Sequence, residues 1–214
     1  MLSHALLLKR AMPMLESAAA ARGEARVGWM SSSARKMQKA IDPAVFGKSD
    51  SMPQALVGDT NAGMLGGAPA WKRYGQTKLA MAVLAMSLHE RLASRNSKVK
   101  MMAVDPGLSA SELQMKATQD YTSMKGWEAR LVFTIAGQSV EDGSLCQTHA
   151  CLAPDVPSGS FIAPEWLGLC GLPVSIAEGG VFRKPGGEAP SISTPELKQA
   201  LMAAVEEAVG GAIV

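Results

Sequence analysis

The sequence is poor in residues that bind metals or form disulfide bonds, with three cysteines and three histidines among 214 residues. The cysteines are odd in number, show no Cys-x-x-Cys spacing, and occur at Cys146, Cys151 and Cys170. Neither a disulfide framework nor a zinc site is expected from this pattern, and no metal ligands are assigned. Reduced thiols in an intracellular protein are the expected state.

Long apolar runs and a surplus of one charge sign are also missing. No uninterrupted apolar segment approaches the ~18 residues that a membrane-spanning helix needs. The apolar start resembles a signal peptide, but Lys9 and Arg10 follow its apolar residues and no clean cleavage site comes after them. We therefore expect an amphipathic helix there and no membrane span. A cytoplasmic location is the default expectation, with an organelle as the alternative.

The charged and aromatic residues do not indicate a nucleic-acid partner. The formal net charge is +2, and aromatic residues make up 5% of the chain. The lysines and arginines are scattered rather than gathered in a basic run with aromatic residues between them. We therefore expect a small-molecule substrate and no nucleic acid.

What the sequence does contain is an alternation of short apolar runs with longer helical patterns. Three apolar runs predict strands: 26–31, 98–104 and 159–163. Helical patterns occur at 2–21, with an interruption at Pro13, and at 71–93, 111–136, 141–152 and 195–209. Strands that alternate with helices of this length form parallel sheets. We predict one α/β domain over 1–214 in which the three strands are adjacent and parallel, in chain order, with helix 71–93 crossing between the first two.

Two stretches lack a clear period. Residues 35–70 are rich in Gly, Pro, Asp and Ser and predict a long loop. Residues 164–193 predict a second loop region, on the substrate side or near the C-terminus of the domain.

Polar residues follow the first two predicted strands. Serines 31–33 follow the first strand, and Pro106-Gly107 follows the second. Tyr74 and Lys78 are four residues apart on the predicted helix 71–93, so they share one face of it. Such a pair alone is more often an ordinary surface pair. Ligands of parallel sheets bind at the carboxyl ends of the strands, and we therefore expect these residues to lie near one another there.

The order of these motifs resembles the short-chain dehydrogenase/reductase family, nearest its retinol-dehydrogenase and WW-domain-oxidoreductase branch. ARVGWMSSSA resembles the strand that ends in the catalytic serine, and YGQTK matches the Tyr-x-x-x-Lys motif. VDPGLSASEL matches the Pro-Gly loop, SGSFIAP resembles the last strand, and LSHALLL resembles the helix before the serine strand. The resemblance covers roughly residues 2–163. It implies a Rossmann-like parallel sheet with flanking helices and an NAD(P)-dependent interconversion of a carbonyl and an alcohol on a lipophilic small molecule.

The resemblance also implies a role for each matched residue. Ser32 would hydrogen-bond the carbonyl oxygen of the substrate, and Tyr74 would donate or accept the proton. Lys78 would favour the phenolate form of Tyr74 by its positive charge and would hold the nicotinamide ribose. The nicotinamide would be contacted by Pro106, Gly107 and Ser111. The family branch slightly favours NADP over NAD.

The front half of the family pattern is missing. No glycine-rich phosphate turn, no residue that selects NAD or NADP and no Asn-Asn-Ala-Gly segment precedes the serine strand. DTNAG at 59–63 resembles the last of these, but it follows the serines and is interpreted as a coincidence. We therefore expect an N-terminally truncated domain with about three strands retained.

The sequence is also consistent with two other functions. A truncated paralogue could be inactive or act by association, and the apolar width of helix 71–93 would suit a homo-oligomer. A protochlorophyllide reductase-like enzyme would share the Tyr-Lys motif and the long segment before it.

Overall fold

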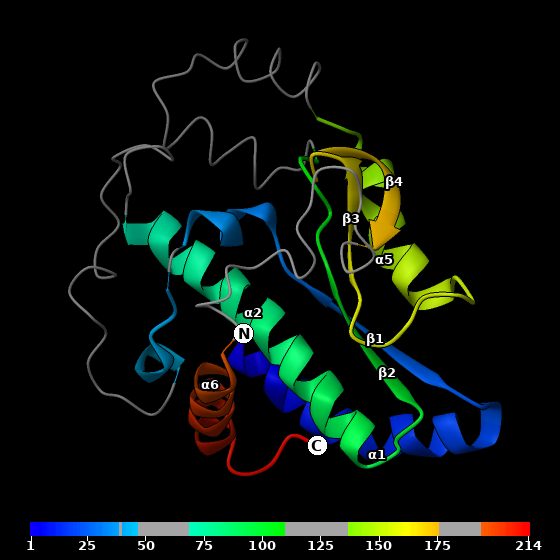
Figure 1. The fold of residues 1–214 in the computed structure, drawn as a ribbon, viewed down its shortest axis with the longest axis vertical. Helices are drawn as coiled ribbons and strands as arrows, with labels where there is room; N and C mark the ends of the chain where they lie inside the picture. The colour runs from blue at the N-terminus through cyan, green and yellow to red at the C-terminus, as the bar shows by residue number, and fades with distance from the viewer. Residues whose placement is uncertain (39, 47–68, 110–136, 176–193) are drawn as a thin grey trace.

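The computed structural model describes residues 1–38, 40–46, 69–109, 137–175 and 194–214. These residues form an α/β fold with one four-stranded mixed sheet and helices on both of its faces (Figure 1). The strands are β1 (Ala25–Met30), β2 (Val99–Val104), β3 (Phe161–Trp166) and β4 (Cys170–Ser175). The helices are α1 (Leu2–Arg22), α2 (Pro69–Ser94), α5 (Val140–Leu152) and α6 (Pro195–Ala208), and two short 3-10 helices are η1 (Ser33–Met37) and η2 (Pro43–Phe46).

The three predicted strands are confirmed in order and direction, and the third covers Phe161–Trp166 rather than 159–163. β1 and β2 are parallel over their full length, from Ala25 opposite Val99 to Met30 opposite Val104. β2 and β3 are parallel, with Ala103 opposite Phe161. α2 connects β1 to β2, as expected for a crossover between parallel strands.

The structure has four strands where about three were predicted, and residues 164–175 of the predicted loop region contain strand instead. β3 continues to Trp166, and β4 returns antiparallel to it within that stretch. The chain reverses where Leu167 and Gly168 have φ angles of 54° and 73°, values that tight hairpin turns require. The glycines and Pro173 concealed this strand, because they are depleted in strands generally but tolerated in an edge strand such as β4.

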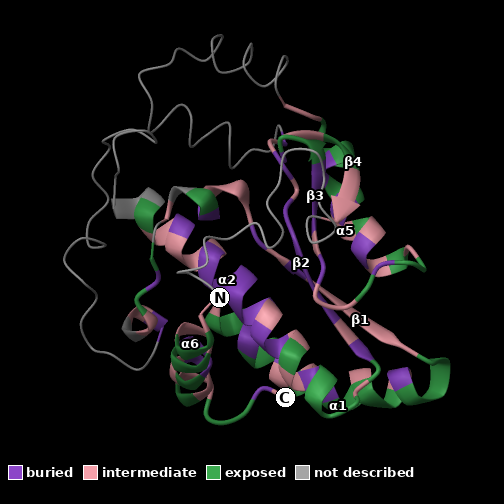
Figure 2. Cartoon of the chain, viewed as in Figure 1, coloured by how far each residue is buried: buried purple, intermediate pink, exposed green. Residues whose placement is uncertain are grey.

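The sheet separates two apolar cores, because successive side chains of a strand point to opposite faces. Val99, Met101 and Ala103 of β2 face the larger core, which α1, α2 and α6 complete. Met102 and Val104 face a smaller core completed by α5 and β3. Figure 2 shows the buried residues concentrated along α2 and the central strands. β2 is therefore covered on both faces, which explains why its residues 101–104 are all apolar.

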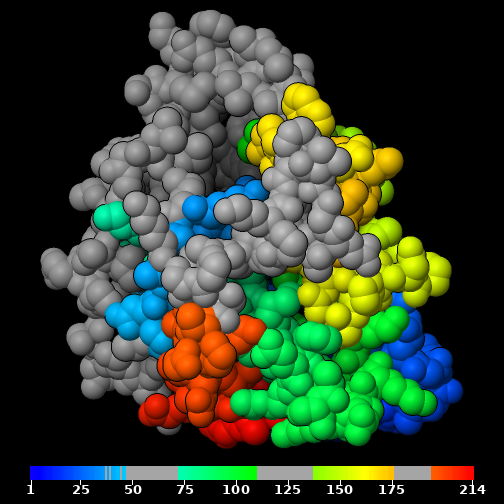
Figure 3. All heavy atoms as spheres, in the orientation of Figure 1, coloured from blue at the N-terminus to red at the C-terminus, as the bar shows by residue number. Residues whose placement is uncertain are grey.

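α2 is buried by its own chain along most of its length. Its stripe of Leu79, Leu84 and Leu88 is fully buried, and α6 lies beside it at the surface (Figure 3). The ion pairs Arg91–Glu206 and Lys198–Glu90 join the two helices. The apolar width that suggested a subunit contact is thus used within the chain.

α1 differs from its prediction because it runs from Leu2 to Arg22 with Pro13 inside it and is not interrupted. It ends at Gly23, whose φ of 93° suits a left-handed C-cap and whose N–H donates to Ala19 O. No helix within the described ranges is both long and apolar enough to cross a membrane.

The helix expected at 111–136 lies wholly outside the described residues, as do residues 47–68 of the first predicted loop and residues 176–193 of the second loop region. The described ends of the first loop contain η1 and η2, and its last two residues belong to α2.

Candidate functional site

The candidate site lies at the carboxyl ends of β1 and β2, where the chain leads into η1 and into the Pro106-Gly107 turn. We call this the strand-end site and define it by Ser32, Tyr74, Lys78, Pro106 and Gly107. α2 packs against η1 and β2, so its N-terminal half brings the tyrosine and the lysine to these strand ends. Ser111, which the resemblance assigned to the same site, lies outside the described residues.

Ser32 is held at the start of η1. Its backbone is extended, with φ −165° and ψ 154°, and its Oγ accepts a hydrogen bond from Ala34 N–H at 3.3 Å. This is an N-cap interaction, which serine favours because its oxygen satisfies an otherwise unpaired backbone N–H. Accepting this bond leaves the hydroxyl hydrogen of Ser32 available to donate.

Lys78 joins α2 to the end of β1. Its Nζ donates to Met30 O at 3.1 Å, and Ser31 Oγ donates to the carbonyl of Lys78 at 2.8 Å. Lys78 Nζ also lies 5.7 Å from the centre of the Tyr74 ring, within the range of a cation–π contact. The structure thus brings Lys78 and Tyr74 together on one face of α2. The bond from Lys78 is to Met30, which lies two residues before Ser32 in the chain. Ser31, which the sequence reading treated as an ordinary strand-end residue, is buried and positions the lysine.

The ammonium group of Lys78 is partly removed from water. Burial lowers the pKa of this group, because the charged form loses hydration, and the carboxylate of Asp105 opposes that decrease. The pKa of the Met1 amine is also lowered, mainly by burial and further by the positive charge of Lys78. Lys78 is therefore a cation in a restricted environment, and Asp105 favours its charged form.

Lys78 also caps an open edge of the sheet. Alternate residues of a parallel strand bond to one neighbour, and here Ala25 and Ser31 donate to β2. The amide groups of Arg26, Gly28 and Met30 consequently face the other side, where β1 is the edge of the described sheet. Gln147 Nε2 donates to Gly28 O at 3.2 Å, next to the bond from Lys78 to Met30 O. Two side chains from opposite faces of the sheet thus satisfy edge carbonyls.

Gly107 occupies a position that only glycine fits. Its φ is +72°, and a Cβ there would lie 2.4 Å from Leu169 O and 2.7 Å from Pro164 Cγ. Leu108 N–H donates to the same Leu169 O at 2.7 Å. The Pro106-Gly107 turn is therefore pressed against the β3–β4 turn and leaves the end of β2 in one defined direction.

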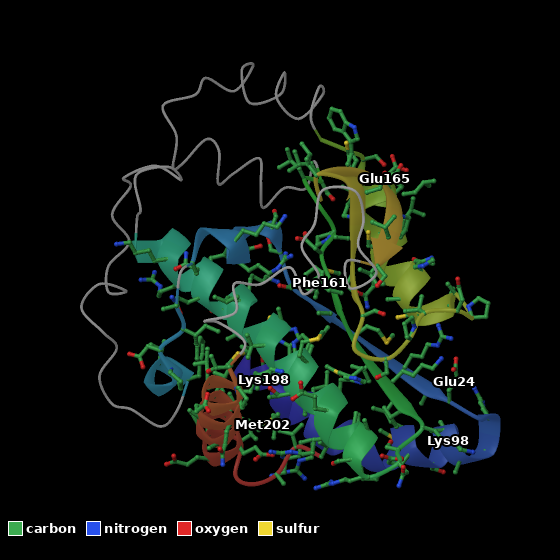
Figure 4. The ribbon with its side chains drawn as sticks, viewed as in Figure 1. Glu24, Lys98, Phe161, Glu165, Lys198 and Met202 are labelled. Carbon is green, nitrogen blue, oxygen red and sulfur yellow. The ribbon has the colours of Figure 1, made fainter. Side chains whose placement is uncertain are left out.

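A buried ion pair lies beneath the site and was not predicted from the sequence. Arg35 Nη1 lies 2.8 Å from Asp105 Oδ2, and both side chains are 1% exposed. The guanidinium carbon of Arg35 lies 3.9 Å from the ring centre of Phe161, which begins β3 (Figure 4). The sequence did hold a signal: Arg35 and Asp105 are opposite charges that each follow one of two adjacent parallel strands.

A separate cavity of about 350 Å³ lies beside the first turns of α2. Its lining residues are Met1, Leu2, Ser3, Val45, Phe46, Arg73, Gln76 and Thr77. Arg73 and Thr77 are offset by one residue from Tyr74 and Lys78, so they lie on a neighbouring face of the helix. The cavity and the strand-end site are thus distinct features.

The described residues contain no cluster of three or more His, Cys, Asp or Glu side chains that could hold a metal ion. Cys146, Cys151 and Cys170 are all free thiols.

Comparison with known proteins gives a structural likeness but no match in sequence to a family or a curated protein. No family model matches the chain, and no curated protein matches it. The chain is similar to an uncharacterized protein from Mycobacterium paratuberculosis, known from a crystal structure, with a TM-score of 0.50 and 19% sequence identity. This likeness is one of fold. It covers 89% of this chain and 52% of that one, so the chain spans about half the length of its structural neighbour.

Proposed function

We propose that this chain carries the catalytic part of an oxidoreductase of the short-chain dehydrogenase/reductase type. The reaction would interconvert a carbonyl and an alcohol on a lipophilic small molecule, with NADP or NAD as cofactor, on a sheet of the Rossmann type. The observation that carries the proposal is the pairing of Lys78 with Tyr74 at the carboxyl end of β1, beside Ser32 and the Pro106-Gly107 turn.

Each residue has a chemical task in this proposal. In the direction of reduction, the hydroxyl of Tyr74 gives its proton to the carbonyl oxygen as that oxygen gains negative charge. The hydroxyl of Ser32 donates a hydrogen bond to the same oxygen and stabilises that charge. The ammonium of Lys78 stabilises the tyrosinate that remains. In the direction of oxidation the proton moves from the alcohol to Tyr74.

We propose that the described residues hold only the nicotinamide end of the cofactor. When bound, the nicotinamide supplies the hydride in reduction and accepts it in oxidation. Lys78 would hold its ribose, and the Pro106-Gly107 turn, which the β3–β4 turn fixes at the end of β2, would lie beside the ring. The pyrophosphate end is different, because no described strand runs through a glycine-rich turn into a helix N-terminus, which is the usual phosphate site. We propose that this grip lies in polypeptide that precedes the serine strand in a longer, complete domain.

Turnover by the chain tests the proposal. Purified protein would be incubated with NADPH or NADH at millimolar concentration, since the missing phosphate contacts predict weak binding, and with a panel of long-chain aldehydes. Mass spectrometry would detect the alcohols. We expect slow, cofactor-dependent reduction that is lost in Tyr74→Phe and kept in Tyr121→Phe, the matched control at the other tyrosine of the chain. Reduction that persists in Tyr74→Phe would remove Tyr74 from the mechanism.

A second candidate function is a non-catalytic protein that acts by association. It is favoured by the open edge of β1, whose outward amide groups can pair with an added strand. Absence of cofactor-dependent reduction, together with a stable oligomer in solution, would favour this function over the enzyme.

A further inference from the structure

We propose that the buried Arg35–Asp105 ion pair is a positioning device that fixes the end of β1 against the end of β2, and so sets where Ser32 and Gly107 lie. The meaning of these two positions for catalysis rests on the proposed function. The geometry of the ion pair does not depend on the proposed function, and this geometry can be tested separately.

A continuous set of hydrogen bonds joins the two segments of the strand-end site. Arg35 Nη1 donates to Ser32 O at 3.2 Å and to Asp105 Oδ2 at 2.8 Å. The other carboxylate oxygen, Asp105 Oδ1, accepts from Gly107 N–H at 3.0 Å. The backbone of Ser32 is thus linked to the backbone of Gly107 through two side chains. A shift of either strand end would break at least one of these bonds.

The planarity of the guanidinium makes the linkage directional. Its donors have fixed directions, unlike those of a lysine ammonium. The contact with Phe161 holds the guanidinium against the start of β3. The pair therefore contacts residues at the ends of β1 and β2 and at the start of β3. A substrate bound at these strand ends would need their backbone to keep one fixed position.

The burial of the pair indicates that it fixes the position of the strand ends rather than only adding to the stability of the fold. Both side chains are 1% exposed, and removing two charges from water costs about as much as their attraction returns. An apolar pair of similar volume would often be as stable. The other ion pairs of the described residues, such as Arg91–Glu206 between α2 and α6, are more exposed. These pairs link side chains near the protein surface, and they make no hydrogen bond to the backbone of the strand-end site.

The pair also acts on Lys78 through charge. Asp105 lies close enough that its carboxylate favours the ammonium form of Lys78 against burial. The charged and titratable groups around Lys78 are Asp105 after β2, Arg35 on η1, the Met1 amine of α1 and Tyr74 on α2 itself. Removing the charge of Asp105 while keeping its shape should therefore change the protonation of Lys78.

Three variants separate positioning from a merely structural role. Arg35→Met with Asp105→Leu replaces both charges by apolar groups and removes the acceptor of Gly107 N–H. Asp105→Asn keeps the shape and an acceptor oxygen but removes the charge. Arg91→Met removes a more exposed ion pair and serves as the control. Retained slow amide exchange in the buried part of α2 reports that each variant is folded.

Two measurements on the 214-residue chain follow, neither of which needs activity. Amide hydrogen exchange at Gly107 should become at least about tenfold faster in the double variant and stay unchanged in Arg91→Met. Labelling of Lys78 by an amine reagent, followed against pH, should shift to lower pH in Asp105→Asn, because the neutral amine appears earlier. Unchanged exchange at Gly107 in a folded double variant would overturn the positioning role. If the double variant does not fold, exchange at Gly107 is measured in Asp105→Asn, which weakens the bond from Arg35, and an unchanged rate there would overturn the proposal.

Turnover distinguishes this inference from the proposed function. If the wild-type chain reduces aldehydes, the double variant should lose at least about tenfold in kcat with little change in KM, since it retains Tyr74, Lys78 and Ser32 but no longer fixes Ser32 relative to Gly107. Unchanged kcat in the folded double variant would refute positioning even if the reductase is established. If the wild-type chain has no activity, the proposed function fails, and the exchange and labelling results still decide whether the pair holds the strand ends together.

Discussion

Substituting Gly107 by alanine tests whether the Pro106-Gly107 turn is pressed against the β3–β4 turn as described. Two costs add at this position. An L-residue at a φ of +72° costs about 1–2 kcal/mol. The new Cβ would also lie 2.4 Å from Leu169 O, a backbone atom that cannot move aside as a flexible side chain can. Overpacking of this kind typically costs about 1–3 kcal/mol. We therefore expect Gly107→Ala to lower the free energy of unfolding by about 2–5 kcal/mol.

The chain offers a matched control at Gly210. Its φ is +74°, nearly that of Gly107, but a Cβ added there has nothing within 4 Å. Gly210→Ala should therefore incur only the backbone cost of about 1–2 kcal/mol. The difference between the two variants isolates the steric contact from the backbone strain.

Urea unfolding followed by far-UV circular dichroism measures this difference. With a denaturant slope of about 2–3 kcal/mol per molar, the steric cost of about 1–3 kcal/mol should place the midpoint of Gly107→Ala roughly 0.3–1.5 M below that of Gly210→Ala. Equal midpoints for the two variants would refute the contact with Leu169 and, with it, the defined direction in which the chain leaves β2.

Two further predictions concern Lys78 and the edge of β1. Because burial lowers the pKa of Lys78 in the folded state, the unfolded state binds more protons between that pKa and the ordinary lysine value, and the free energy of unfolding should rise with pH across this window. Urea midpoints from about pH 8 to pH 11 should show a rise that is smaller in Lys78→Met, and identical profiles for the two proteins would contradict the buried ammonium. The open edge of β1 should make the chain associate as its concentration increases, as measured by size-exclusion chromatography with light scattering. A monomer at every concentration would show that Lys78 and Gln147 protect the edge sufficiently.

The elements that the sequence predicted are those whose pattern is local and repetitive. The apolar stripe of α2 and the apolar residues 101–104 of β2 each indicate burial within a short window, on one face for the helix and on both faces for the strand. Their alternation was enough to predict a parallel β1–β2–β3 arrangement, because crossover connections permit few others.

The elements that the sequence did not predict depend on partners far along the chain. β4 is a strand only because it pairs with β3, and its Gly171 and Pro173 argue locally for a loop. The Arg35–Asp105 pair joins residues seventy positions apart, and neither residue has a local pattern that marks it as buried. Pro13 stays within α1 although proline in a helix interior usually breaks it.

We propose that the strand ends of this chain bind the nicotinamide end of a dinucleotide and not its adenine end. Saturation-transfer difference NMR on NADPH mixed with the purified chain tests this directly, because ligand protons nearest the protein receive the most saturation. We expect strong transfer to the protons of the nicotinamide and its ribose, weak transfer to the adenine protons, and loss of the nicotinamide signal in Lys78→Met. Stronger transfer to the adenine than to the nicotinamide, or no transfer to either, would contradict this proposal.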